Sequence, residues 1–207
     1  MVDKEVILNH ALMMFNVNGI KPVTMDNISM DLKISKRTLY EIFDNKDDVV
    51  EQVMDYDITH KHEEIKEIIR KTDNIFAALS EIVEKMLAKK RKMKQNPRFY
   101  EDLKKYYPAT YAQTIKRINE DMFNTVFKLI ERGKLEGYFK KEIDTEIIIS
   151  TIIVIVKATQ NGSYDLSKTT RNFFDTLVIP YLIGISTESG RELLDNQIKR
   201  IKGKETK

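Results

Sequence analysis

Apolar residues recur at intervals of three and four along most of the chain, whereas long alternating runs of apolar and polar residues are scarce. This spacing is typical of amphipathic helices, because it places the apolar side chains on one face. Only 7 Gly and 4 Pro interrupt the 207 residues. The pattern predicts an all-α fold in which helices are joined by short turns.

Capping residues divide the first part of the chain into short helices. Asp3, Thr24, Ser35 and Asn45 each precede a periodic segment, as helix N-caps do, and Gly19 suits the position that ends a helix. We expect helices over residues 3–17, 25–32, 36–43 and 46–70. Further helices are expected over 75–89, from 97, over 108–133, 144–160 and 167–180, and over 191–201.

The stretch ISKRTLYEIFDNKDDVV, residues 34–50, places basic and hydroxyl groups between apolar anchors. Together with the helix before it, this stretch predicts a helix-turn-helix, whose second helix enters the major groove of DNA. Arg37 or Lys36 could donate to guanine O6 and N7, whereas Ser35, Thr38 and Tyr40 suit phosphate oxygens. The alternative, at even odds on spacing alone, is a solvated face of an ordinary helical bundle.

The charge distribution limits how the DNA hypothesis can be argued. The formal net charge is +3. Acidic residues nevertheless outnumber basic ones in residues 1–60, and the basic excess lies in residues 61–143. A nucleic-acid function therefore cannot rest on overall basicity and must rest on individually placed residues.

Residues 7–54 resemble the DNA-binding region of the tetracycline-repressor (TetR) family. ALMMFNVNGI resembles the family's first helix, TMDNIS its Thr-capped second helix, and ISKRTLYEIFDNKDDVV its recognition helix and the start of its fourth helix. The resemblance implies a DNA-binding domain over residues 1–46 and a helical ligand-binding and dimerisation domain over 47–207, connected by the helix 46–70. It implies DNA contacts by Thr24, Ser35, Lys36, Arg37, Thr38, Tyr40 and Lys46.

Two positions depart from the family pattern. Members usually have Ala-Gly in the turn, where this chain has Leu32 and Lys33. Glycine there tolerates a positive φ that lysine disfavours, so we expect a strained or altered turn, from which Lys33 could reach a phosphate. Arg37 stands where many members have Gly or Ala, which makes it our candidate for a base-specific contact.

The C-terminal part carries the expected dimer interface. The segment EIIISTIIVIVKA is apolar nearly all round, so its own core can cover only one face, and a two-fold partner would cover the other. The resemblance implies that the last two long helices of each subunit form this interface. A less favoured alternative buries both helices inside one monomer. The expected interface residues are Ile148, Ile152, Ile155, Phe173, Leu177 and Tyr181.

A ligand pocket between the helices is the default site in a bundle. Aromatic and Met side chains at helical spacing are more often plain core, so these residues mark a region only. The candidates are Met86, Phe99, Tyr100, Tyr107, Tyr111, Met122, Phe123 and Phe127. The effector is expected to be a largely apolar small molecule of unknown identity.

Other chemistry is not indicated. The chain has no Cys, and His60 and His62 point to different sides of a helix, so we expect no metal site and no cofactor. We find no phosphate-binding glycine loop or catalytic constellation and expect no enzymatic activity. The N-terminal residues lack a secretory pattern, and no apolar run reaches the roughly 20 residues of a membrane span, so a cytoplasmic protein is expected.

Taken together, the sequence predicts a dimeric, ligand-responsive repressor that binds a palindromic operator. The alternative from another class is an all-α protein-binding or scaffold module that never meets DNA.

Overall fold

The structure, a computed structural model, describes residues 3–82, 85, 97–158 and 178–204. The described residues are almost entirely helical and contain no strand, only an isolated antiparallel bridge between Phe139 and Ser186. The all-α prediction is therefore confirmed. By their contacts the residues form two compact units, Met1–Lys71 with Glu81–Asp121, and Thr72–Ser80 with Met122–Lys207.

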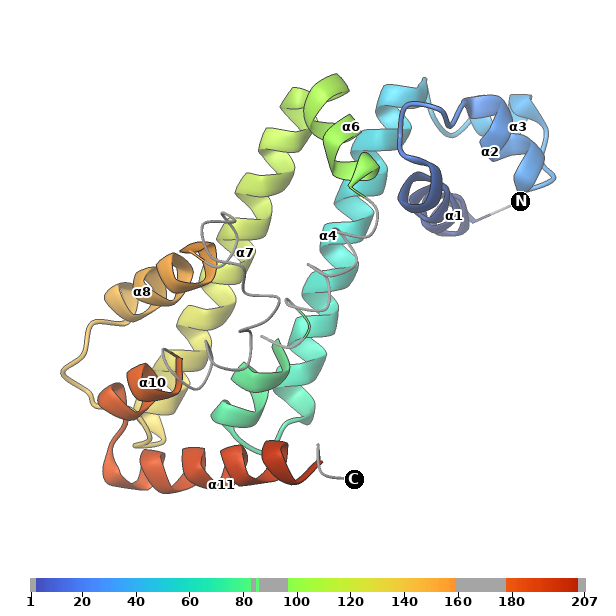
Figure 1. Cartoon of the computed structure of the whole chain (residues 1–207). Helices are drawn as coiled ribbons and strands as arrows, with labels where there is room; N and C mark the ends of the chain where they lie inside the picture. Colours follow the sequence, from blue (N-terminus) through green and yellow to red (C-terminus); the bar gives the residue numbers. More distant parts are fainter. Residues whose placement is uncertain (1–2, 83–84, 86–96, 159–177, 205–207) are drawn as a thin grey trace. The chain divides into compact units, whose positions relative to one another are not determined.

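The first unit contains a small helical domain and the helices that support it. α1 (Lys4–Asn18), α2 (Met25–Asp31) and α3 (Lys36–Tyr40) gather near the N-terminal end of α4 (Lys46–Lys71), as Figure 1 shows. α6 (Arg98–Tyr106) and the first half of α7 (Pro108–Leu135) complete this unit.

One apolar core joins the helices of the first unit. α1 supplies one apolar stripe, with Ile7, Ala11 and Phe15 completely buried. Phe99 and Leu103 of α6 belong to the same core, although they lie far along the chain. The three short helices are therefore built on both α4 and α6. The other members are Leu8, Ile20, Val23, Met25, Ile28, Leu39, Phe43, Val49, Val50, Val53 and Met54.

The second unit contains the remainder of α7, α8 (Thr145–Ala158), α10 (Ile179–Ile185) and α11 (Glu188–Lys204), together with the helical residues 75–80. Asp144 caps α8, since its Oδ1 accepts from the backbone N–H groups of Glu146 at 2.8 Å and Ile147 at 3.1 Å. Phe76 and Phe139 pack edge to face in its core, with ring centroids 5.4 Å apart. The helix expected over 167–180 lies mostly outside the described residues.

Candidate nucleic-acid interface

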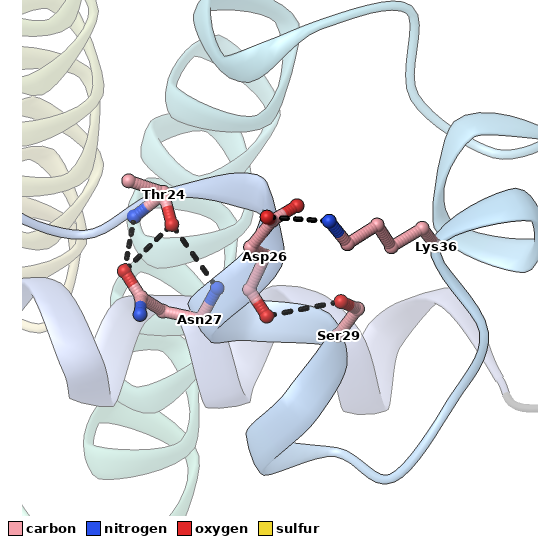
Figure 2. A network of polar contacts seen from close by, with 5 residues as sticks. All are labelled: Thr24, Asp26, Asn27, Ser29 and Lys36. Carbon is pink, nitrogen blue, oxygen red and sulfur yellow. Dashed lines mark hydrogen bonds and ion pairs between the residues drawn. The ribbon is translucent and has the colours of Figure 1, made fainter.

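Side-chain caps fix where α2 and α3 begin. Thr24 Oγ1 accepts from the backbone N–H of Asn27 at 3.1 Å, and Asn27 Oδ1 accepts from the backbone N–H of Thr24 at 2.8 Å, which forms a capping box. Figure 2 shows this reciprocal pair. Ser35 Oγ accepts from the backbone N–H of Thr38 at 3.0 Å and caps α3. Both predicted caps are thus present.

The turn between α2 and α3 has the backbone of a Schellman motif. The N–H of Ile34 donates to the carbonyl of Ser29 at 3.0 Å, and the N–H of Lys33 donates to that of Met30 at 3.1 Å. Lys33 has φ +55°, the only positive φ of a non-glycine residue in the described chain. The predicted conformational strain at this lysine is therefore present.

The outer face of α3 consists of polar and basic groups. Leu39 and Phe43 are buried beneath it, with 0% and 1% of their surfaces exposed. The side chain of Arg37 is 89% exposed, and Tyr40 as a whole residue is 52% exposed. α3 itself is shorter than predicted and ends at Tyr40, after which the N–H of Ile42 donates to the carbonyl of Leu39, three residues back, at 3.2 Å in a turn.

Carboxylates hold both basic residues of α3. Lys36 Nζ lies 2.5 Å from Oδ2 of Asp26, across from α3 to α2, as Figure 2 shows. Arg37 Nε donates to Oε1 of Glu41 at 2.9 Å, one turn along. We had not predicted either partner. The Arg37–Glu41 pair has a sequence signal in its spacing of four, whereas Asp26 and Lys36 are ten residues apart and have none.

Three other predicted contact residues already have partners inside the chain. Lys46 Nζ donates to the backbone carbonyl of Lys21 at 3.0 Å, and partial burial lowers the pKa of Lys46. The Thr38 hydroxyl bonds that of Ser35 at 2.8 Å, and the Thr24 hydroxyl donates to Asn27 Oδ1 at 2.7 Å. Lys46, with three N–H donors, keeps capacity for a phosphate, while the hydroxyls mainly shape the helix ends.

The predicted pocket residues are divided between the two units. Phe99 is 1% exposed and belongs to the core of the first unit. Tyr100, Tyr107 and Tyr111 pack against the same core. Met122, Phe123 and Phe127 belong to the second unit, and Met86 lies outside the described residues. A hollow of about 10 Å³ between α4 and α7 has room for one water at most.

The residues expected at a dimer interface differ in exposure. Ile148 is completely buried in the chain. Ile147 and Val154, seven residues apart on α8, are instead 64% and 65% exposed. Tyr181 of α10 is half-buried. The side chains of Ile152, Ile155, Phe173 and Leu177 lie outside the described residues.

No group of three or more His, Asp or Glu residues in the described chain could hold a metal ion. Over the same residues, no helix combines the length and the apolar character that a membrane span requires.

Comparison with known proteins agrees with this geometry. Residues 7–53 match the sequence model of the family described as bacterial regulatory proteins, tetR family. The match covers the three short helices, the turn and the start of α4. Residues 7–53 are therefore a TetR-family N-terminal domain. A search of curated protein sequences gave no match.

Solved structures share the fold over most of the chain. A transcriptional regulator from Cytophaga hutchinsonii superposes with a TM-score of 0.68 at 20% identity, over 88% of this chain and 98% of its own. A second regulator from that organism, of the TetR family, gives 0.64 at 15% identity, over 91% and 99%. FadR from Bacillus subtilis, solved with stearoyl-CoA, gives 0.56 at 17% identity, over 83% and 96%. The protein has the fold of TetR-family transcriptional regulators.

Proposed function

We propose that this protein is a homodimeric transcriptional repressor that binds a palindromic operator through α3 and is released by an apolar small molecule. The observation that most supports the proposal is the outer face of α3, where exposed Lys36, Arg37 and Tyr40 stand above the buried Leu39 and behind the Ser35 cap. As a regulator of bacterial DNA it acts in the cytoplasm, and we propose no enzymatic role for it.

Each exposed residue has a part in this proposal. Arg37 reads a guanine in the major groove, because a guanidinium can donate twice to O6 and N7. Its contact with Glu41 takes one of five N–H donors and leaves the others. Lys36, Tyr40 and Lys33 bind phosphates, which position the helix without reading sequence.

A second subunit supplies the other half-site. Ile147 and Val154 lie on one side of α8, and an exposed apolar pair on a helix is stabilised when a partner covers it. Two-fold pairing would place two copies of α3 roughly 34–36 Å apart, one turn of DNA, or somewhat more. A palindromic operator follows from this symmetry.

The effector acts by linkage. A ligand that binds better to the subunit arrangement that does not fit DNA lowers the affinity for the operator. By linkage, the operator lowers the affinity for the ligand by the same factor. FadR from Bacillus subtilis was solved with stearoyl-CoA, so we propose fatty acyl-CoA thioesters, in which the acyl chain is the apolar part, as the first class to test. Adding stearoyl-CoA to the operator complex should dissociate it, and an unchanged complex would exclude this class.

The DNA function is tested by selecting duplexes from a random pool with the full-length protein and measuring affinity by gel shift over a salt series. Specific binding that weakens steeply with salt is expected. Arg37→Ala should relax the preference at one position in each half-site, at a cost of about 1–3 kcal/mol on the operator. Lys46→Ala should weaken all duplexes about equally.

Two results would count against this function. Recovery of no enriched duplex would favour the protein-binding alternative. An Arg37→Ala variant with unchanged affinity and preference would remove the base contact from the proposal. Glu63→Gln, in the surface pair with Lys66 on α4, serves as a control that alters charge away from α3.

A further inference from the structure

Asp26 places a carboxylate beside the surface that is proposed to bind DNA, where the phosphates would repel it. It lies in the first turn of α2, 52% exposed, and its Oδ2 contacts Lys36 Nζ at 2.5 Å. Its backbone carbonyl accepts from Ser29 Oγ at 3.0 Å, and Ser29 is 1% exposed. Figure 2 shows the Asp26 carboxylate directed across to α3, beside the Thr24 and Asn27 capping box. The capping box and the Ser29 bond fix the backbone that carries the carboxylate.

The Asp26–Lys36 pair can be exchanged for other contacts. Both side chains are more than half exposed, and exposed ion pairs contribute little to stability because water screens them. Lys36 can therefore leave Asp26 for a phosphate at small cost. The negative charge of Asp26, in contrast, remains at the surface wherever the lysine goes.

That fixed charge affects different DNA sequences differently. On DNA of unrelated sequence the helix is held by phosphates alone, and a carboxylate within a Debye length of about 8–10 Å repels them. On the operator a carboxylate can accept from the N4 amino group of a cytosine, which compensates for the repulsion. Such a group discriminates by penalising the wrong partner.

We propose that Asp26 is a specificity-determining residue that weakens binding to non-operator DNA more than it weakens binding to the operator. The inference rests on the proposed function and adds a residue to it. It also gives a role to the excess of acidic residues in residues 1–60, which suppresses the sequence-independent attraction that a basic domain would have.

The test compares full-length wild type with Asp26→Asn on two duplexes, the operator selected by wild type and a scrambled duplex of equal length. The variant should bind the scrambled duplex about fivefold more tightly and the operator less than twofold more tightly. The dependence of log affinity on log salt for the scrambled duplex should become steeper by about one charge. Circular dichroism during heating checks that the variant keeps the helix content and thermal stability of wild type.

Glu63→Gln is the matched control, because it removes one carboxylate from a Lys–Glu pair on α4, about 25 Å along that helix from its first residue. It should leave the ratio of the two affinities unchanged. The proposal is overturned if Asp26→Asn alters both duplexes equally, or alters them no more than Glu63→Gln does. If wild type enriches no duplex at all, the proposed function fails and this inference fails with it.

Discussion

Asp102 of α6 accepts a 2.7 Å hydrogen bond from the backbone N–H of Lys21, in the loop between α1 and α2. Lys46, the first residue of α4, donates to the carbonyl of the same Lys21 at 3.0 Å. Two helices thus hold one residue of the loop that leads into the helix-turn-helix. Gly19 fits beside them at φ +85°, since a Cβ there would lie 2.9 Å from Asp102 Oδ2. A shift of α6 would therefore move or strain this loop.

Removal of the Asp102 carboxylate should loosen the loop. Asp102→Ala leaves the Lys21 N–H without its partner, which should lower the free energy of unfolding by about 1–2 kcal/mol. Asp102→Asn keeps an acceptor oxygen and should lose less. Urea denaturation measures both variants, and equal stability of Asp102→Ala and wild type would show that the bond contributes nothing.

Replacement of Lys33 by glycine should stabilise the protein. A non-glycine residue in the left-handed region costs roughly 1–2 kcal/mol, and the greater freedom of glycine in the unfolded chain offsets part of that gain. We expect Lys33→Gly to raise the free energy of unfolding by about 0.5 kcal/mol. Lys66→Gly, inside α4, is the control and should lower it by about 1 kcal/mol. Destabilisation by both variants would argue against strain at Lys33.

Three glycines of the second unit should respond differently to alanine. A Cβ on Gly190 would lie 2.0 Å from the carbonyl oxygen of Tyr138, and one on Gly133 would lie 2.6 Å from Ile75 Cδ1. Both substitutions should cost about 1–3 kcal/mol or more, because backbone or core must move. Gly184→Ala is the control, since no atom of the described residues lies within 4 Å of its Cβ position. The melting temperature of Gly184→Ala should equal or exceed that of wild type. A Gly190→Ala variant as stable as wild type would contradict the close approach of Gly190 to the Tyr138 carbonyl.

The Glu131 carboxylate should titrate at unusually low pH. The Thr145 hydroxyl bonds it, and Lys134 Nζ lies 3.2 Å away, and these contacts lower the pKa of Glu131. Because the folded pKa is the lower one, the stabilisation is present above the unfolded pKa and is lost as the pH falls through the folded value. Thr145→Val should raise the pKa of Glu131 in a carboxyl NMR titration. An unchanged titration curve would exclude the hydroxyl as the cause.

The exposed face of α8 should decide the oligomeric state. Ile147→Glu together with Val154→Glu places two charges where we propose a partner covers apolar surface, so the double variant should elute as a monomer on a sizing column. Val6→Glu with Met13→Glu is the control, because these α1 residues are 52% and 58% exposed but lie outside the proposed interface. A double α8 variant that still elutes as a dimer would reject this interface.

The sequence by itself determined the local features of this protein. Each N-cap bonds a residue two or three positions further along the chain, as at Asp3, Thr24, Ser35 and Asn45. The neighbouring residues in the sequence are therefore sufficient to predict these caps. The strain at Lys33 was predictable from the resemblance, because members of the family usually have glycine at this position of the turn. These features define the helix-turn-helix, which the family comparison confirms.

Only the tertiary structure decided which charges and faces are available. Asp26 meets Lys36 across ten residues, and Asp102 meets Lys21 across eighty-one, through the packing of separate helices. The burial of Ile148 and the exposure of its neighbour Ile147 depend on which side of α8 faces its own core, and a segment apolar nearly all round does not specify that side. Periodicity locates helices, but the choice of contacting faces is made by long-range packing.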